Sequence, residues 1–212
     1  MTAPDTLDNP LFARIWTFMS SHETDWLRDR RRENLAGLSG RVLEVGAGTG
    51  SNFAFYPDTV TAVVAAEPES QLREAAEVAA AAAPVPITVV ASTVEALDPA
   101  EPFDAIVCSL VLCSVERPEA VLRQLFSLLK PGGELRYFEH VASPGVRGGL
   151  QRLADATFWP RLFGNCHTHR ETEQMITAAG FVVDRARRGQ QFPAWVPLPV
   201  SEFALGSASR PA

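Results

Sequence analysis

The alternation of strand-like and helix-like segments constrains the fold more than any other feature of this chain. Short apolar runs, rich in β-branched residues, occur at residues 42–45, 59–66, 87–90, 105–110 and 135–138. Amphipathic or Ala-rich segments at residues 70–82 and 116–129 lie between them and are stopped by prolines. This β-α-β alternation predicts a parallel sheet with helices on both faces. Right-handed crossovers then make the topology doubly wound.

Both ends of the chain add elements to this core. Apolar residues at helical spacing after Pro10, and a charged segment at about residues 23–35 with Trp26 as its main apolar contact, predict two N-terminal helices. Beyond His140 the alternation stops. We expect there an inserted helix at residues 148–163, a last helix at 171–179, and two more strands at 181–183 and 201–205. The predicted class is α/β, with a doubly wound, mostly parallel seven-stranded sheet.

The first predicted strand runs into a glycine-rich turn, LEVGAGTG at residues 43–50. Glycine allows positive φ and lets a ligand approach the backbone closely. Ligands of doubly wound sheets bind beyond the carboxyl ends of the strands, so the turn is placed for a cofactor. The spacing of Gly46, Gly48 and Gly50 differs from the GxGxxG pattern of dinucleotide-binding proteins, because position 51 is serine.

Two acids near this turn point to a cationic cofactor. Glu44 lies two residues before the first glycine, where a carboxylate would repel a pyrophosphate and attract a cation. S-adenosylmethionine carries a sulfonium and an ammonium group and no phosphate, so the turn predicts this cofactor over NAD. Glu67, just after the second predicted strand, is expected to hydrogen-bond the ribose hydroxyls. Glu69 is expected to be a solvated loop acid.

With these residues placed, the chain resembles the class I S-adenosylmethionine-dependent methyltransferases, which have a Rossmann-like fold. The resemblance is strongest over residues 41–141. It is carried by LEVGAGTG, by Glu67, by Phe103-Asp104 at the start of the fourth strand and by LKPGG at residues 129–133. Together these elements form a specific signature, although none of them is specific alone.

A narrower set of segments is similar to the methyltransferase-like thiol methyltransferases of animals and their bacterial relatives. These segments are NFAFYP at residues 52–57, LVLCSV at 110–115, EHV at 139–141 and residues 164–171. The animal proteins methylate small alkyl thiols and carry an N-terminal membrane anchor, which we do not find in this sequence. Because fold relatives often differ in substrate, the resemblance implies a thiol acceptor only as a hypothesis.

The resemblance also implies which residues contact the cofactor. The methionine part is expected beside Glu44, Gly46, Gly48 and Gly50, and the ribose beside Glu67. Thr93 and Val94, after the third strand, would bracket the adenine, although the family often has an acid where Thr93 stands. Leu110, at the end of the fourth strand, would lie near the methionine part and the reacting methyl group.

Methyl transfer from a sulfonium is an in-line displacement, so alignment of the reactants matters most. A general base is needed only where the acceptor arrives protonated. His140 is the best candidate, because it follows the fifth strand and histidine titrates near neutral pH. A histidine held by hydrogen bonds for structure is an equal alternative. Glu139 is expected either to orient His140 or to form a salt bridge.

The run Cys166-His167-Thr168-His169 invites comparison with metal sites. Its two histidines are only two residues apart, and the sequence offers no second ligand cluster, so we predict no metal. A loop over the substrate, or N-capping of the next helix by Thr168, is favoured. Cys113, just after the fourth strand, is expected to be a small buried side chain, with contact to the substrate as the alternative.

The remaining expectations concern side chains outside the cofactor motifs. Phe158, Trp159 and Phe163 on the inserted segment are expected to wall an apolar pocket, with a place in the core as the alternative. Arg30, Arg31 and Arg32 are expected to form a solvated helix face.

Composition and organisation limit the partners. The net charge of −6 argues against binding a nucleic acid backbone. We predict a soluble cytoplasmic protein with no integral membrane segment. The sequence has three cysteines and no signal peptide, and prolines interrupt its apolar stretch at residues 78–90. We expect a single domain with a helical cap (1–38), a cofactor-binding core (39–141) and a substrate-side insertion with the last strands (142–212). The oligomeric state is left open.

The function expected from the sequence is S-adenosylmethionine-dependent methyl transfer to a small-molecule acceptor, with a thiol as one candidate. Two alternatives stay open. One is methylation of a lipid or quinone head group at a membrane surface, and the other is a non-catalytic protein that binds S-adenosylmethionine.

Overall fold

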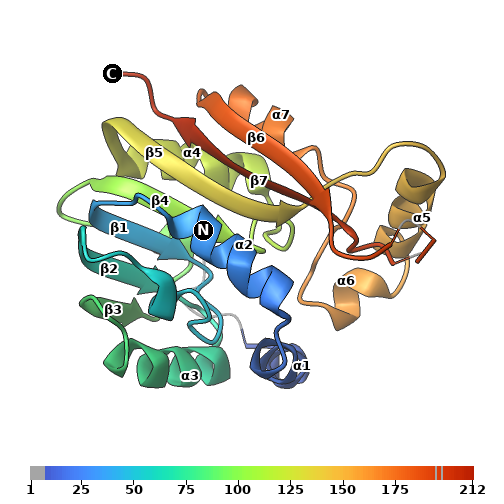
Figure 1. The fold of residues 1–212 in the computed structure, drawn as a ribbon, viewed down its shortest axis with the longest axis horizontal. Coiled ribbons are helices and arrows are strands. Elements are labelled where there is room, and N and C mark those ends of the chain that lie inside the picture. Colours follow the sequence, from blue (N-terminus) through green and yellow to red (C-terminus); the bar gives the residue numbers. More distant parts are fainter. Residues whose placement is uncertain (1–7, 194, 197) are drawn as a thin grey trace.

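The computed structural model describes residues 8–193, 195–196 and 198–212, which form one sheet flanked by helices (Figure 1). The seven strands lie in the order β3-β2-β1-β4-β5-β7-β6. Only β7 is antiparallel to its neighbours, so the predicted doubly wound, mostly parallel sheet is confirmed. The strands are β1 (Gly40–Val45), β2 (Val60–Ala66), β3 (Ile87–Val90), β4 (Phe103–Ser109), β5 (Leu129–His140), β6 (Val182–Gln190) and β7 (Glu202–Ser209).

The strand order reverses between β1 and β4, which are direct neighbours. From β1 the chain winds outward to β2 and β3, and from β4 it winds the other way to β5. In doubly wound sheets the crevice for ligands opens at the carboxyl ends of the two strands at this reversal. The glycine-rich turn follows one of these strands and Leu110 follows the other, so the topology brings both to the crevice.

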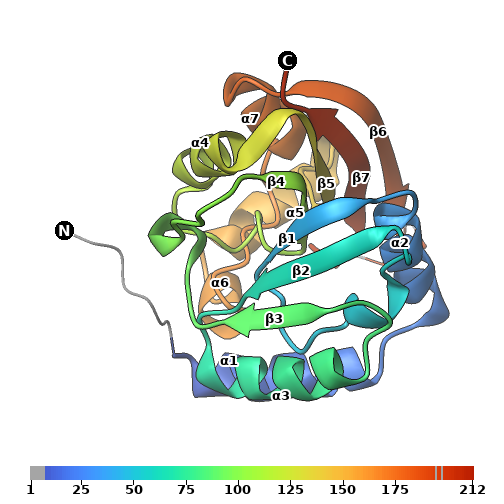
Figure 2. The ribbon, with the colours of Figure 1, turned by 90° about the vertical axis from the view of Figure 1, so that its left-hand side faces the viewer.

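Helices cover both faces of the sheet, as Figures 1 and 2 show. One face packs against α4 and α7, and the other against α2 and α3. Alternate residues of β1 pack on opposite faces of the sheet. Leu43 and Val45 lie on the face covered by α4 and α7, and Val42 lies on the face covered by α2 and α3. The helices are α1 (Pro10–Ser21), α2 (Asp25–Leu35), α3 (Ser70–Ala81), α4 (Pro118–Leu128), α5 (Gly145–Asp155), α6 (Trp159–Leu162) and α7 (Thr172–Ala178).

The segment after β5 differs from the expected single inserted helix. It forms α5 and α6, which are separated at residues 156–158. The Thr157 hydroxyl donates to the carbonyls of Leu153 and Ala154, and Pro160 lies in the first turn of α6. Proline favours the start of a helix, because it lacks the N–H that a helix interior requires. These local signals divide the segment.

The last two strands are longer than expected, and β6 forms an edge of the sheet. Most of its side chains are exposed, including Arg185, Arg187 and Arg188. Charged side chains on an edge strand prevent it from pairing with other chains. Because such a strand contains few apolar residues, a search for apolar runs does not predict its full length. Strand β5 is also longer than expected, because it begins at Leu129, before Pro131-Gly132-Gly133.

The three consecutive arginines of α2 do not form a uniform solvated face. Arg31 is buried, forms a salt bridge with Glu23, and donates from Nη1 to Asn52 Oδ1 at 3.0 Å. Arg32 is exposed and pairs with Asp29, as expected of a surface residue. Every third or fourth residue of a helix shares a face, so one of three consecutive arginines turns toward the sheet.

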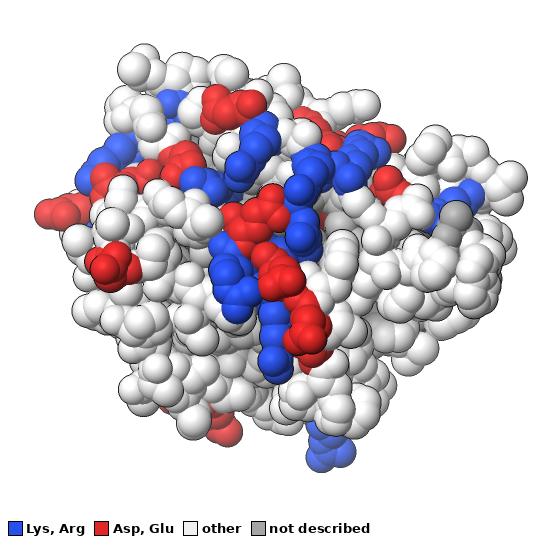
Figure 3. All heavy atoms as spheres, viewed as in Figure 1, with Lys and Arg blue, Asp and Glu red and all other residues white. Residues whose placement is uncertain are grey.

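Positive and negative side chains are interleaved on the face of the molecule shown in Figure 3. Arg30 of α2 and Arg187 of β6 both pair with Glu33, and Arg188 pairs with Glu173.

In the described part of the chain, no helix is long and apolar enough to cross a membrane.

Replacing Arg31 by alanine is expected to destabilise the protein strongly. The change would leave the buried carboxylate of Glu23 without its partner, which typically costs about 3–5 kcal/mol. The matched variant Arg32→Ala removes an exposed pair and should cost less than about 1 kcal/mol. Urea unfolding gives both free energies. Equal losses for the two variants would contradict the inward role of Arg31.

Candidate functional site

The glycine turn after β1 adopts a backbone that other residues rarely take. Gly46, Gly48 and Gly50 have φ values of 61°, 58° and 77°. A Cβ on Gly46 would lie 2.6 Å from Val111 Cγ2, and one on Gly48 would lie 2.7 Å from Trp16 Nε1. Both the conformation and the close packing therefore require glycine. Trp16 belongs to α1, so the N-terminal helix covers this turn.

Glu44 is buried on β1 immediately before the turn. Its carboxylate accepts hydrogen bonds from Asn52 Nδ2 at 2.9 Å and from the Tyr56 hydroxyl at 2.6 Å. Asn52 also donates to Ser109 Oγ at 3.1 Å and accepts from Arg31. Burial raises the pKa of Glu44 to about 7, although both hydrogen bonds lower it.

The residues that hold Glu44 were not expected to be part of the site. Asn52 and Tyr56 lie in the NFAFYP segment, which the sequence analysis noted only as a family resemblance. A polar residue and a tyrosine a few positions after a glycine turn were the available signal. Ser109 and Arg31 join them only through the packing of β4 and α2.

Glu67 follows β2 and is only 5% exposed. One carboxylate oxygen accepts from the Gly48 N–H at 2.7 Å, and the other from the Glu69 N–H at 2.9 Å. Burial raises the pKa of Glu67 to about 7. A carboxylate has about four acceptor positions, so two remain for further donors. Glu67 thus ties the glycine turn to the end of β2.

Glu69 is not the solvated loop acid that the sequence suggested. Its side chain is buried and caps α3, with Oε2 accepting from the Leu72 N–H at 2.7 Å. An acid at this position satisfies an N–H that the first helical turn leaves unpaired. Thr93 and Val94, the expected adenine neighbours, are buried after β3, where a short 3₁₀ helix (η2, Val94–Ala96) begins.

Leu110 has a positive φ of 62°, a conformation that costs a leucine roughly 1–2 kcal/mol. Backbone strain of this kind is concentrated at functional sites. The loop after it is held by Glu139, whose buried carboxylate accepts the N–H groups of Val111, Leu112 and Cys113 at 2.9–3.2 Å. Glu139 therefore orders this loop. The sequence had predicted a different role for Glu139, either to orient His140 or to form a salt bridge.

His140, at the carboxyl end of β5, is half-buried, and its ring lies against Phe203 with a centroid distance of 4.6 Å. Its Nδ1 lies 3.6 Å from Cys113 Sγ and 3.7 Å from Cys166 Sγ. The two sulfur atoms are 3.8 Å apart. These three side chains form a compact group that was not predicted, because its members are far apart in the sequence and meet only in the folded chain.

The rest of the 166–169 run has other partners. The backbone N–H groups of Thr168 and His169 donate to the Asp155 carboxylate, and the Thr168 hydroxyl does so as well. The predicted N-capping by Thr168 is therefore wrong, since α7 begins later, at Thr172. His169 Nε2 lies 3.0 Å from Arg152 Nη1. Asp155 thus secures the loop that carries Cys166.

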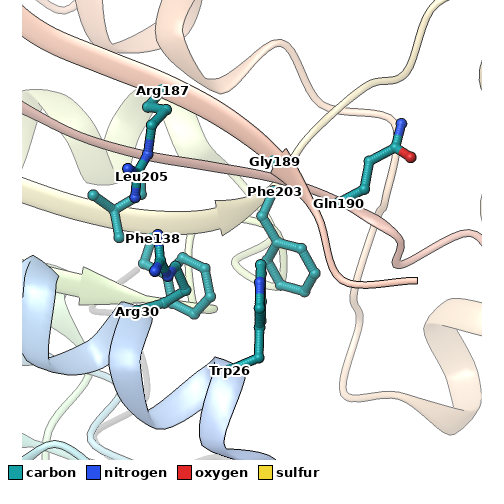
Figure 4. A pocket seen from close by; sticks show the side chains of 8 residues that line it. All are labelled: Trp26, Arg30, Phe138, Arg187, Gly189, Gln190, Phe203 and Leu205. Atoms are coloured by element: carbon teal, nitrogen blue, oxygen red, sulfur yellow. The ribbon is translucent and has the colours of Figure 1, made fainter. Parts of the chain in front are cut away.

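A cavity of about 110 Å³ lies between α2 and the strands β5, β6 and β7 (Figure 4). Phe203 connects it to His140 at the carboxyl end of β5, since its ring stacks on Phe138 at 5.1 Å and also contacts the His140 ring. The cavity does not include the glycine turn. It is lined by Trp26, Arg30, Phe138, Arg187, Gly189, Gln190, Phe203 and Leu205.

The aromatic residues that were expected to wall a pocket do not line this cavity. Trp159 and Phe163 stack on each other at 4.1 Å, and Phe158 is 60% exposed. The aromatic wall comes instead from α2, β5 and β7, elements that are distant in sequence. Only the tertiary structure brings these rings together.

The residues around the turn fit S-adenosylmethionine. The turn presents a side-chain-free backbone, two buried carboxylates lie beside it, and the turn itself carries no lysine or arginine. A cationic ligand without phosphate suits this distribution of charge. A doubly wound sheet with this turn at its reversal point defines the class I S-adenosylmethionine-dependent methyltransferases.

Comparisons with known proteins agree. A family model described as a methyltransferase domain matches residues 19–186. The chain is 36% identical over 206 residues to thiol S-methyltransferase TMT1B of Mus musculus, covering 93% of this chain and 82% of that protein. It is 34% identical over 165 residues to thiol S-methyltransferase TMT1A of Homo sapiens, covering 70% and 64%.

Solved structures share the fold at low sequence identity. N-methyltransferase NodS of Bradyrhizobium japonicum WM9, in complex with S-adenosyl-L-homocysteine, superposes with a TM-score of 0.70 at 16% identity, covering 96% of this chain and 100% of that one. A putative methyltransferase of Bacillus halodurans gives 0.71 at 15% identity, covering 87% and 99%. The chain belongs to the methyltransferase-domain family, and it is an S-adenosylmethionine-dependent methyltransferase.

The stability of the ligand-free protein is expected to depend on pH through Glu44. Its folded-state pKa of about 7 lies above the usual 4.5, so between these values the folded state binds more protons than the unfolded state. The free energy of unfolding therefore falls as pH rises through this window. Glu44→Gln should remove part of the fall, roughly 1–3 kcal/mol.

Urea unfolding at several pH values between 4.5 and 7 measures this difference. Glu74→Gln, on the exposed side of α3, is the matched control and should leave the pH profile unchanged. A Glu44→Gln profile parallel to that of the unmodified protein would show that Glu44 titrates normally.

Proposed function

We propose that this enzyme transfers the methyl group of S-adenosylmethionine to the sulfur of a small alkyl thiol. The observation that carries the proposal is the 36% identity to a thiol S-methyltransferase across 93% of the chain. A match of that extent includes both the glycine turn and the residues around His140. The apolar ring of Phe203 beside His140 suits an acceptor with an alkyl group.

We also propose how the cofactor lies along the carboxyl edge. The methionine part would be held beside Glu44, Gly46, Gly48, Gly50 and Leu110, and Glu67 would accept hydrogen bonds from the ribose hydroxyls. Thr93 and Val94 would border the adenine. The proposal is supported by the common edge on which these residues lie and by the two acceptor positions left on Glu67. When bound, the cofactor supplies an electrophilic methyl group on a sulfonium.

The protein's own part in the reaction is then mainly alignment. Holding two reactants in line supplies roughly 7–11 kcal/mol of barrier lowering. A thiol must also lose its proton, because the thiolate is the nucleophile. We propose that His140, at the carboxyl end of β5, assists in removing this proton from the acceptor thiol. We also propose that the protein is cytoplasmic. All three cysteines are unpaired free thiols, which is consistent with this location.

A quinone or lipid head group is the second candidate acceptor. The aromatic cavity of Figure 4 has Arg30 and Arg187 among its lining residues, which would suit an amphipathic ligand with a negative head. Both arginines share the one carboxylate of Glu33, which compensates one of their two positive charges. The thiol stays the first candidate because the match to a thiol S-methyltransferase covers 93% of the chain.

A panel of matched acceptors tests the thiol proposal. Alkyl thiols, the corresponding alcohols and amines, a short-chain quinol and phospholipid vesicles would each be incubated with radiolabelled S-adenosylmethionine. Turnover with a thiol is expected to exceed that with the matched alcohol by at least about 10²-fold, the usual size of a proton-removal effect. Methylation of the quinol or lipid alone would replace the thiol assignment. Cofactor binding without methylation of any acceptor would favour the non-catalytic alternative.

Glu67→Gln is expected to weaken binding of S-adenosylhomocysteine by about 10- to 100-fold. This is the range for losing a hydrogen bond to a charged group, about 1.5–3 kcal/mol. Isothermal titration calorimetry measures the affinity, and thermal unfolding checks that the fold persists. Glu74→Gln again serves as the exposed control. Unchanged affinity in Glu67→Gln would remove this residue from the ribose contact.

A further inference from the structure

We propose that Cys113, His140 and Cys166 bind a zinc ion, with a fourth coordination position open to the acceptor thiol. The part of the proposal that concerns the acceptor rests on the function proposed above. The zinc site itself does not, because it follows from the geometry of the three side chains.

The distances between the three ligand atoms match a tetrahedral zinc site. With Zn–S of about 2.3 Å and Zn–N of about 2.0–2.1 Å, tetrahedral angles place two sulfurs about 3.8 Å apart and sulfur and nitrogen about 3.6 Å apart. The sulfurs are 3.8 Å apart, and His140 Nδ1 lies 3.6 Å and 3.7 Å from them. All three edges of one tetrahedral face are therefore already in place.

Hydrogen bonds to the backbone of the two cysteine loops fix these positions without a metal. The His167 N–H donates to the Cys113 carbonyl at 2.8 Å, and Asn165 Nδ2 donates to the Ser114 carbonyl at 2.7 Å. These two contacts join the loop that carries Cys166 to the loop that carries Cys113. Glu139 fixes the Cys113 loop from its other side. Such outer contacts are what a preorganised metal site requires.

The surroundings suit two thiolates and a divalent cation. Cys113 is 1% exposed and Cys166 is 6% exposed, so water is largely excluded. Arg170 donates to the Leu112 carbonyl, and its guanidinium interacts electrostatically with both cysteines. Without a metal, the neighbouring Cys166 thiol and burial raise the pKa of Cys113. Coordination to zinc deprotonates a thiol outright, and the two new negative charges balance the ion.

Three protein ligands of the Cys₂His type leave one position free, as in catalytic zinc sites. The Cys113 loop also carries Val111, whose side chain packs on Gly46 of the cofactor turn. The site and the turn are therefore on the same edge of the sheet. An acceptor thiol at the fourth position would stay near the methyl donor.

The resulting step balances without another reactant. The acceptor thiol releases its proton to solvent on coordination and is held as a thiolate. Its sulfur lone pair forms the new S–CH₃ bond while the bond from the methyl carbon to the sulfonium sulfur breaks. The products are a neutral thioether and S-adenosylhomocysteine, and zinc keeps its charge. His140 assists proton removal in this scheme as a ligand, in place of a general base.

The first experiment measures metal binding without reference to activity. Native protein, and protein reloaded with zinc or cobalt after chelation, would be assayed by elemental analysis and by the visible and near-ultraviolet spectrum of the cobalt form. We expect about one metal per chain and a sulfur-to-cobalt charge-transfer band, the signature of thiolate ligation. Cys113→Ser, Cys166→Ser and His140→Asn should each bind zinc at least about tenfold more weakly.

Cys108→Ser is the matched control, because Cys108 is equally buried on β4 but is not part of the group. It should retain the metal and the charge-transfer band. Titration of free thiols would be run alongside. No metal in native or reloaded protein, a Cys113–Cys166 disulfide in place of metal, or equal binding by all the variants would overturn the site.

The second experiment tests the open position. Adding an alkyl thiol to the cobalt form should change its visible spectrum, and removing zinc should lower kcat for thiol methylation by about 10²-fold, with S-adenosylhomocysteine affinity unchanged. Equal thiol methylation with and without zinc would overturn the zinc role while the proposed function stands. Metal binding with no methylation of any thiol would overturn the proposed function and the acceptor step together, and would leave only the zinc site.

Discussion

Buried carboxylates at the carboxyl ends of the strands hold together the edge of the sheet where the glycine turn and His140 lie. Glu44 binds Asn52 and Tyr56, Glu67 binds the N–H groups of Gly48 and Glu69, and Glu139 binds three successive N–H groups after β4. Loops at this edge cannot satisfy their own N–H groups, and an unpaired buried N–H is costly. Each carboxylate accepts hydrogen bonds from groups in these loops. The same hydrogen bonds offset the cost of burying the carboxylate. The positions of the glycine turn and of Cys113 depend on this exchange.

The proposed function assigns one side of this edge to the cofactor and the other side to the acceptor. The glycine turn and Glu67 follow β1 and β2, whereas His140 belongs to β5 and the aromatic wall to β5, β7 and α2. Leu110, with its strained backbone, lies between the two sides. Helix α1 covers the cofactor side through Trp16, and its Phe12 packs on Gly164, just before Cys166. This helix therefore touches both sides, and a ligand that enters either one must be accommodated beneath it.

Prediction from sequence succeeded where local chemistry decides the structure. Strand-like runs separated by helices and prolines predicted the parallel sheet, and the positive φ of Gly46, Gly48 and Gly50 agrees with their predicted turn. It failed where packing reverses a local preference. Arg31 and Glu69 look solvated in sequence, yet both are buried with partners. Charged side chains concealed the length of the edge strand β6. The break between α5 and α6 is different, because Thr157 and Pro160 are local signals that the sequence already contains.

The sequence by itself determined the fold class and the glycine turn, and it placed Glu44 and Glu67 beside that turn, because periodicity, glycine spacing and charge act over a few residues. Only the tertiary structure decided which side chains meet near the carboxyl ends of β4 and β5. Cys113, His140 and Cys166 come from three separate loops and strand ends, and Trp26, Phe138 and Phe203 come from a helix and two strands. Their meeting depends on strand order and crossover packing, which no short stretch of sequence specifies.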